Sequence, residues 1–261
     1  MAFINRGSVK LYYELHGDAG PFIILTHGFS ATSQMWRGQI AEFSKKHRLV
    51  IWDMRGHGRS DYPDDASAYS EEAVIEDIAA LLDAVGAETA IVGGLSLGGY
   101  MSLAFYAAHP QRVSALIIVD TGPGFRNDGA RENWNKYALA TASKLASEGL
   151  ALLRSASPER AASEHRSSFG LVHAARGMLT QKDAHIINCL PDIAVPTLVV
   201  VGANDQPFLG AADYMAKRIP GAQKVVIAEA GHASNIDQPA IFNKAVSDFL
   251  AAVKPDGEGA P

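Results

Sequence analysis

IVGGLSLGGY, residues 91–100, decides the fold of this chain because an apolar run ends abruptly at a serine that lies between glycines. The run from Thr89 to Leu95 is typical of a buried strand, and the residues that follow the serine favour a helix. Gly94 and Gly98 leave room for a sharp strand-to-helix turn in which larger side chains would collide. In this context the pattern Gly-x-Ser-x-Gly predicts a nucleophile elbow with Ser96 at its tip. The alternative is a glycine-rich turn in which Ser96 only caps the helix.

Apolar runs of similar length recur along the chain and alternate with helical patterns. Three of them lack polar alternation, which is typical of strands that are covered on both faces: 22–26, 49–52 and 113–119. Further strands are expected at 197–202 and 225–227. Val9 to Leu15 instead alternates apolar and polar residues, and we expect an antiparallel edge strand there. Helical spacing is found at 34–46, 71–85 and 239–253. Strands that alternate with helices predict an α/β fold built on a mostly parallel sheet.

The alternation stops between Gly122 and about Pro191, where no β-like run is present and helix-forming residues predominate. We therefore expect a helical cap at 122–191, inserted into a core made of 1–121 and 192–254. The last residues, 255–261, contain little to bury and predict a disordered tail.

Size and charge limit the classes of function. With 261 residues, 48% of them apolar, the chain is long enough to build one large core without disulfide or metal support. Its net charge of −5 offers no basic surface to nucleic acid or anionic lipid, so a small neutral molecule is the expected partner.

No apolar run is long enough to cross a bilayer and the first residues lack a signal-peptide pattern, so we expect a cytoplasmic protein. Cys189 is the only cysteine, which excludes an intramolecular disulfide and predicts a small core residue.

Ser96 needs a base within hydrogen-bond reach, because a serine hydroxyl is a poor nucleophile at neutral pH. Asp205 and His232 each follow a predicted strand, which places both on the same carboxyl edge of the sheet as the elbow. In the resulting triad, His232 takes the proton from Ser96 and Asp205 fixes the tautomer of the imidazole. Asp120, at the end of an earlier strand, is the alternative acid, and Asp205 has the alternative role of a helix cap.

An acyl-transfer serine also needs hydrogen-bond donors for the oxyanion that forms during the reaction. The backbone amide of Leu97, directly after the nucleophile, is one candidate. The amide of Phe29 is the other, because Phe29 follows the end of a predicted strand and Gly28 permits a close approach of the backbone to the substrate.

Together these motifs resemble the α/β-hydrolase superfamily, and in particular its small ester and lactone hydrolases. That group includes 3-oxoadipate enol-lactonases, haloperoxidase-like esterases and hydrolases of carbon-carbon bonds. The resemblance covers nearly the whole chain and rests on motifs in the family's order: His27-Gly28-Phe29, residues 53–60, Gly94 to Gly99, Asp205 and Gly231-His232.

The resemblance implies the α/β-hydrolase fold, with a mostly parallel eight-stranded sheet flanked by helices and a helical cap inserted after the sixth strand. It also implies the same triad and the same two oxyanion amides, and it makes residues 53–60 mostly a structural turn beside the site. One departure is Gln206, which stands between Asp205 and Pro207, where many relatives place a proline directly after the acid.

The functional hypothesis is a serine hydrolase that cleaves a small carboxylic ester or lactone through an acyl-enzyme, without a metal or an organic cofactor. Serine at position 96 argues against the dehalogenases and epoxide hydrolases of similar fold, which place a carboxylate there. Two alternatives stay open: a carbon-carbon bond hydrolase of the meta-cleavage type, and a ligand receptor that keeps the hydrolase fold with little turnover. Candidate pocket residues around Ser96 are aromatic: Trp36, Tyr100, Trp134, Tyr137 and Phe208. The sequence predicts neither the acyl chain nor the oligomeric state.

Overall fold

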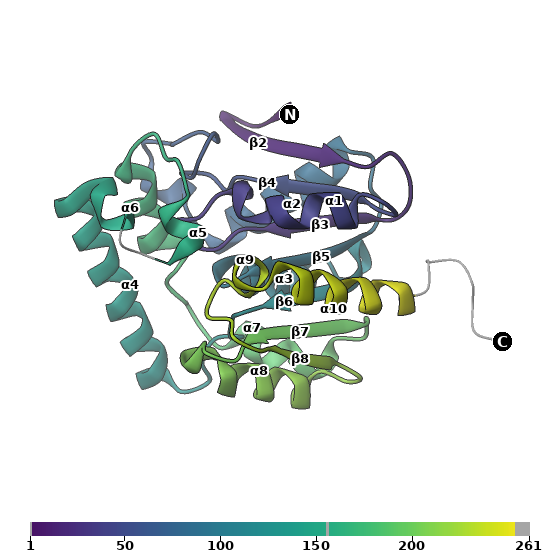
Figure 1. Ribbon diagram of the computed structural model, residues 1–261. Helices are drawn as coiled ribbons and strands as arrows, with labels where there is room; N and C mark the ends of the chain where they lie inside the picture. The colour runs from purple at the N-terminus through teal and green to yellow at the C-terminus, as the bar shows by residue number, and fades with distance from the viewer. Residues whose placement is uncertain (1, 155–156, 254–261) are drawn as a thin grey trace.

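The computed structural model describes residues 2–154 and 157–253, so the predicted tail at 255–261 lies outside the described residues. The described part contains an eight-stranded sheet of order β1-β2-β4-β3-β5-β6-β7-β8, with helices on both faces (Figure 1). The strands are β1 (Ala2–Arg6), β2 (Val9–His16), β3 (Phe22–Thr26), β4 (Arg48–Trp52), β5 (Ala90–Leu95), β6 (Val113–Val119), β7 (Thr197–Gly202) and β8 (Gln223–Ile227). The α-helices are α1 (Arg37–Phe43), α2 (Glu71–Ala84), α3 (Leu97–Ala108), α4 (Asp128–Glu148), α5 (Pro158–Ala161), α6 (Ser168–Gly177), α7 (His185–Cys189), α8 (Gln206–Arg218), α9 (Ser234–Asp237) and α10 (Pro239–Ala252). Short 3-10 helices are η1 (Ser33–Trp36), η2 (Ala66–Ala68), η3 (Pro110–Arg112), η4 (Gly149–Leu153) and η5 (Leu190–Asp192).

The sheet is mostly parallel, as the sequence predicts. Strands β3 to β8 pair in parallel, whereas β1 and β2 are antiparallel to their neighbours. The prediction that residues 9–15 form an edge strand is wrong, because β2 pairs with both β1 and β4. The edge strand on this side of the sheet is β1, a five-residue strand whose pattern was too short to be recognised in the sequence.

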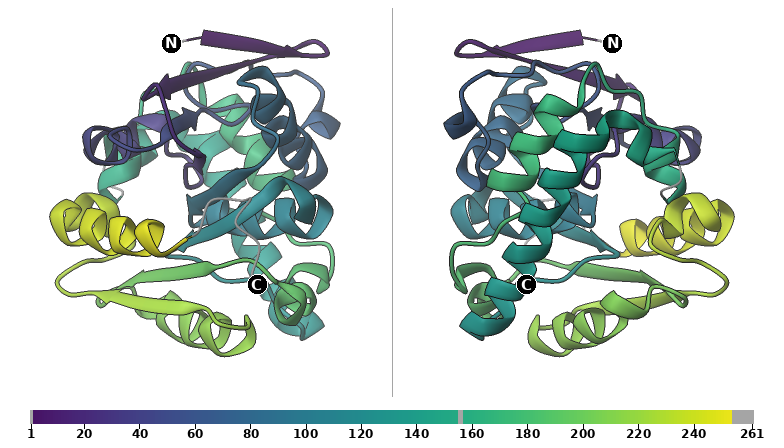
Figure 2. Two further views of the ribbon diagram at one scale, coloured as in Figure 1. Left: turned by 90° about the vertical axis from the view of Figure 1, so that its right-hand side faces the viewer. Right: turned by 90° about the vertical axis from the view of Figure 1, so that its left-hand side faces the viewer.

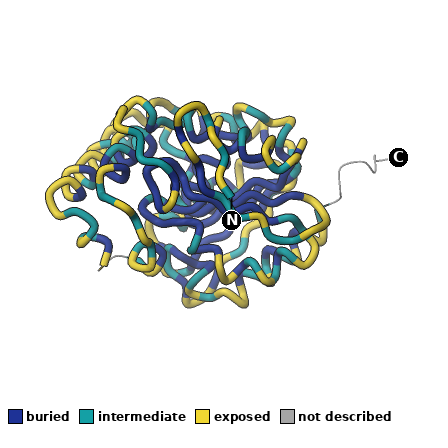
Figure 3. The backbone as a smooth tube through the Cα atoms, turned by 90° about the horizontal axis from the view of Figure 1, so that it is seen from above, coloured by how far each residue is buried: buried dark blue, intermediate teal, exposed yellow. Residues whose placement is uncertain are grey.

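The sheet separates two apolar layers, and this explains why its central strands lack polar alternation. The side chain of Ile24 packs into the layer under α2, α3 and α8, while its neighbours Ile23 and Leu25 pack into the layer under α1 and α10. Each such side chain contributes roughly 1.5–3 kcal/mol when it is fully buried. Figure 3 shows the buried strands through the middle of the molecule, with exposed backbone at its periphery.

Helices α4, α5 and α6 stand beside the sheet (Figure 1), and α4, η4 and α6 share an apolar cluster of their own. α4 and α6 pack against each other around Ala142, Leu145 and Leu171, and Figure 2 shows them crossing one side of the molecule. They follow β6, where the sequence predicts the insertion. α7 instead contacts α3 in the main core, so the boundary at residue 191 stays a prediction.

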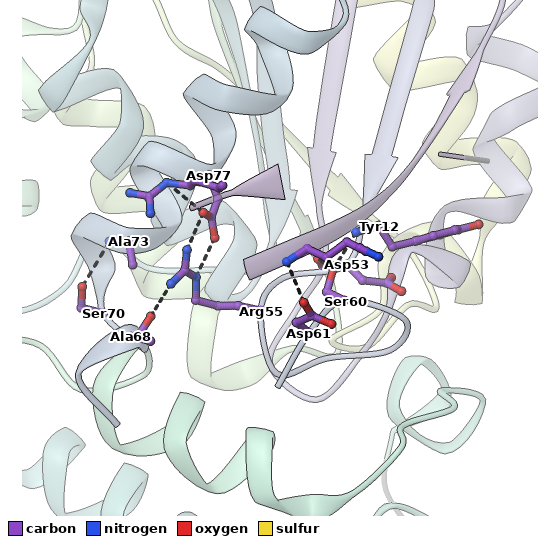
Figure 4. A network of polar contacts seen from close by, with 11 residues as sticks. Tyr12, Asp53, Arg55, Ser60, Asp61, Ala68, Ser70, Ala73 and Asp77 are labelled. Atoms are coloured by element: carbon purple, nitrogen blue, oxygen red, sulfur yellow. Dashed lines mark hydrogen bonds and ion pairs between the residues drawn. The ribbon is translucent and has the colours of Figure 1, made fainter. Parts of the chain in front are cut away.

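The turn at 53–60 is held by its own polar groups, as Figure 4 shows. The carboxylate of Asp53 accepts hydrogen bonds from the amides of Ser33 at 2.7 Å and Arg59 at 2.9 Å. The buried guanidinium of Arg55 donates from Nε and Nη2 to the two carboxylate oxygens of Asp77 in α2, at 2.7 and 2.6 Å. These bonds join the loop after β4 to the helix that covers the sheet.

Candidate active site

Ser96 lies at the turn between β5 and α3 with a φ of +55°, a left-handed backbone conformation that costs a serine about 1–3 kcal/mol. Its amide donates to Val119 O at 2.9 Å and its carbonyl accepts from Thr121 Oγ1 at 2.7 Å, so both neighbouring segments hold the turn. A Cβ at position Gly94 would lie 2.5 Å from the backbone of Gly98, and glycine is therefore required there. Ser96 makes no side-chain cap hydrogen bond to α3, so the alternative of a simple helix cap is wrong.

Asp205 and His232 meet at the carboxyl ends of β7 and β8. Nδ1 of His232 donates to Oδ2 of the buried Asp205 at 2.8 Å, and Asp205 makes no side-chain cap bond to α8. Burial opposes the charged form of His232, but the hydrogen bond and the charge of Asp205, with smaller effects of the Asp120 and Glu159 charges, outweigh burial and raise the pKa of the imidazole. The ring of Phe208 stacks on the imidazole at 5.0 Å between centroids.

Ser96 and His232 line the same cavity. Among the described residues, no hydrogen bond joins the serine hydroxyl to the imidazole, a separation that is common before substrate is bound. With Nδ1 occupied by Asp205, Nε2 is the nitrogen left to act as a base.

Asp120, the alternative acid, is fully buried at the end of β6 and is used elsewhere. Its carboxylate accepts hydrogen bonds from the amide of Gly202 at 2.7 Å and from the amide and hydroxyl of Ser234 at 3.2 and 2.5 Å. Burial raises the pKa of Asp120 to about 7. The structure therefore brings Asp205, and not Asp120, to the imidazole of His232, while Asp120 ties β7 to the loop that carries His232.

The two predicted oxyanion donors lie beside Ser96. Leu97 is the first residue of α3, where an amide has no acceptor within the helix. Phe29 follows Gly28, at which an added Cβ would lie 3.5 Å from Cβ of Ser96. In the described part of the chain, no acceptor takes a hydrogen bond from the amide of Phe29. Both amides are thus free to bind an oxygen next to the serine.

Ser30, the residue after Phe29, is held on three sides. Its backbone has a φ of +55°, and its amide donates to Nε2 of His57 at 3.2 Å. Its carbonyl accepts from Nε2 of His165 at 3.0 Å, and its hydroxyl accepts from Nε of Arg160 at 2.7 Å. Arg160 and His165 belong to the segment between η4 and α6, so this segment helps to hold the loop that carries the Phe29 amide.

Two buried histidines, His27 and His57, and the partly buried His165 support this loop. His27 accepts from the amide of Met54 at Nε2 and donates from Nδ1 to Gly28 O, which fixes its tautomer. Burial lowers the pKa of His27 to about 4, and burial also lowers the pKa values of His57 and His165. The rings of His27 and His57 lie 4.9 Å apart between centroids.

Two adjoining cavities meet at Ser96. The smaller cavity, about 120 Å³, has mostly apolar walls, with Tyr100, Trp134 and Phe208 among its lining residues. The larger cavity, about 480 Å³, is lined by His232, Asp205, Phe29, Tyr137, Glu159 and Arg160, among others. Trp134 and Phe208 lie between the two and line both.

Four of the five predicted pocket residues therefore line a cavity at Ser96, and the prediction for Trp36 is wrong. Trp36 is fully buried in the layer between the sheet and α10, with its ring 6.4 Å from that of Phe242. It lies close to Phe29 in the sequence, but η1 turns its side chain into the core.

Residues 21–169 match the family model of the alpha/beta hydrolase fold. The chain belongs to this family. It is 28% identical to 3-oxoadipate enol-lactonase 2 of Acinetobacter baylyi, over 95% of this chain and 95% of that protein. It is 27% identical to a putative 2-succinyl-6-hydroxy-2,4-cyclohexadiene-1-carboxylate synthase of Bacillus subtilis, over 90% of this chain and 92% of that protein. A thermophilic esterase from Thermogutta terrifontis has a similar structure, with a TM-score of 0.79 and 30% identity over 95% of each chain. The chain is thus a hydrolase of the α/β fold related to enol-lactonases and esterases.

Sequence reasoning missed several polar residues of this hydrolase's site. Arg160, His165 and Glu159 lie in a segment where the only sequence signal is helical composition, and nothing there marks a residue that reaches the sheet. Gln181, which lines the smaller cavity, follows α6 in a loop without a motif. The predicted core position of Cys189 is also wrong, because its side chain is only partly buried.

Two general features of the site region follow from the described residues. Within 2–154 and 157–253, no group of three or more His, Cys, Asp or Glu side chains is arranged to hold a metal ion. No helix in the same part of the hydrolase is both long enough and apolar enough to span a membrane.

Proposed function

We propose that this hydrolase cleaves a small carboxylic ester or lactone through an acyl-enzyme on Ser96, with His232 as the general base and Asp205 as the residue that orients it. The observation that carries the proposal is the 2.8 Å hydrogen bond from His232 Nδ1 to Asp205, in a cavity that Ser96 also lines. The similarity to enol-lactonases and esterases supports the same class of substrate.

In the first half of the reaction, Nε2 of His232 takes the proton from Oγ of Ser96 while Oγ attacks the carbonyl carbon. The amides of Phe29 and Leu97 stabilise the oxyanion, and a single donor of this kind typically contributes about a hundred- to a thousandfold in rate. The imidazolium then gives its proton to the leaving alkoxide, and the ester oxygen departs as an alcohol.

In the second half, His232 takes a proton from water, which attacks the acyl-enzyme. Collapse of the second tetrahedral intermediate returns the proton to Oγ of Ser96 and releases the carboxylic acid. In a lactone the leaving hydroxyl stays attached to the acyl chain, so the same steps give a hydroxy acid.

The test is turnover of a short p-nitrophenyl ester by Ser96→Ala, with labelling of the wild type by a fluorophosphonate. We expect no turnover by the variant and a mass adduct on Ser96 alone. Ser102→Ala is the matched control, because Ser102 lies nearly two turns further along α3 and its hydroxyl donates to Gly98 O.

Full activity of Ser96→Ala would refute the proposal. Turnover confined to ring-cleavage diketones would favour the carbon-carbon hydrolase. Tight ligand binding with negligible turnover would favour the receptor.

A further inference from the structure

The positions of the two cavities relative to His232 distinguish the two halves of a substrate. His232 must reach the leaving oxygen, and it lines the larger cavity but not the smaller one. Given the proposed function, on which this inference rests, the alcohol part therefore occupies the larger cavity. The acyl part occupies the smaller cavity, which we call the acyl pocket and which Ser96, Leu97, Tyr100, Thr121, Trp134 and Gln181 help to line.

Most polar side chains of the acyl pocket already have partners in the protein. Nε1 of Trp134 donates to Leu179 O at 2.7 Å, and Oγ1 of Thr121 donates to Ser96 O at 2.7 Å. The hydroxyl of Tyr100 is hydrogen-bonded to Glu71. These groups shape the pocket but are not available to a ligand.

The carboxamide of Gln181 is different. The residue is 8% exposed, and its Oε1 is buried without a hydrogen-bond partner in the described part of the chain. Its backbone is fixed by Asn135, which accepts from the Gln181 amide and donates to the Gln181 carbonyl, both at 2.8 Å. A buried amide without a partner is unfavourable, and a ligand that supplies the missing bond relieves this cost.

The neighbouring backbone is shaped to leave room for this carboxamide. Gly124 has a φ of +90°, and a Cβ added there would lie 3.0 Å from Oε1 of Gln181. None of the side chains that line the pocket, all within the described residues, is charged. The pocket thus offers one neutral hydrogen-bonding group in an otherwise mostly apolar surface.

We propose that Gln181 is a specificity-determining residue, and that the acyl group of the substrate is small, uncharged and hydroxylated. The unpaired atom is an acceptor, so its partner is a donor. A hydroxyl also accepts, and it therefore satisfies the carboxamide in either of its two orientations. The volume of about 120 Å³ is slightly below that of a cavity that holds benzene, about 150 Å³, which limits the acyl group to about six heavy atoms.

The experiment compares kcat/KM for methyl butanoate with kcat/KM for methyl 2- and 3-hydroxybutanoate, each as single enantiomers, using a pH indicator. We expect the wild type to prefer one hydroxy ester by about two- to tenfold, the effect of one net hydrogen bond. Gln181→Leu should remove this preference, so that the ratio of kcat/KM for the hydroxy ester to kcat/KM for butanoate falls to about one. Gln181→Met is a second variant in case the leucine variant does not fold, and Gln223→Leu makes the same change at an exposed position of β8.

A Gln181 variant that keeps the preference, or that slows all esters equally, overturns the inference. If the wild type hydrolyses the esters and is labelled at Ser96 but has no preference for a hydroxy ester, the inference fails and the proposed function stands. If the wild type hydrolyses none of them and is not labelled at Ser96, the proposed function fails and the inference fails with it.

Discussion

Replacing Asp205 with asparagine should remove most of the turnover while the protein stays folded. Oδ2 of Asp205 accepts from His232 Nδ1 at 2.8 Å, and this carboxylate contributes most to raising the pKa of the imidazole against the effect of burial. An amide has no negative charge to stabilise the imidazolium, and its N–H favours the wrong tautomer of the ring. In a Ser-His-Asp triad this change lowers kcat by about 10⁴-fold, which corresponds to about 5.4 kcal/mol of transition-state stabilisation.

Asp120→Asn is the matched control, because it makes the same chemical change at a buried carboxylate that is not hydrogen-bonded to His232 and raises the pKa of the imidazole less than Asp205 does. Asparagine would present an N–H to at least one of the three donors that Asp120 now accepts from, Gly202 N, Ser234 N and Ser234 Oγ. We expect a loss of about 1–3 kcal/mol in the free energy of unfolding. We expect kcat to stay within about tenfold of the wild type, since the bond between Asp205 and His232 remains.

The assay is kcat on a short p-nitrophenyl ester, with the folded fraction of each variant measured by urea denaturation. Equal losses of kcat in Asp120→Asn and Asp205→Asn, at equal folded fractions, would refute the assignment of Asp205 as the orienting acid.

Two further predictions follow from the site and from the turn after β4. The pH profile of kcat/KM should rise with pH through a midpoint above 6.5, because His232 must be neutral to act as a base and its pKa is raised. In Asp205→Asn this midpoint should fall. An unchanged midpoint would contradict the role of Asp205 in raising the pKa of His232. Asp77→Asn should lower the free energy of unfolding in urea by about 3–5 kcal/mol, because the guanidinium of Arg55 would stay buried without its carboxylate. Adding Arg55→Met should recover part of the loss, and a double variant as unstable as the single one would count against this account.

The sequence was sufficient to predict the fold because its strongest signals are local. Continuous apolar runs mark strands that are buried on both faces, and Gly94 and Gly98 mark the turn at Ser96 through steric demands within a few residues. The positions of Asp205 and His232 followed from a topological rule, since the carboxyl ends of parallel strands share one edge of the sheet.

The parts of the site that sequence reasoning missed or misplaced depend on packing between distant segments. Arg160 and His165 reach Ser30 across more than a hundred residues of chain, and helical composition alone does not show which side chains face the sheet. The sequence predicts Trp36 in the pocket as one of several aromatic residues, but the direction of a side chain leaving a short 3-10 helix is set by the core beneath it. Gln181 is recognised only because its buried Oε1 lacks a hydrogen-bond partner, and a sequence pattern does not show which polar atoms stay unpaired after folding.

The hydrogen bonds that hold Ser30 link the wall of the larger cavity to the loop that carries the Phe29 amide. The stretch that supplies Arg160 and His165 also supplies part of the wall of the larger cavity, through Glu159 and Arg160 itself. Displacement of that wall would remove the hydrogen bonds that Arg160 and His165 make to Ser30, the residue adjacent to the Phe29 amide. A substitution in this part of the wall would therefore disturb the oxyanion donor as well as the shape of the larger cavity.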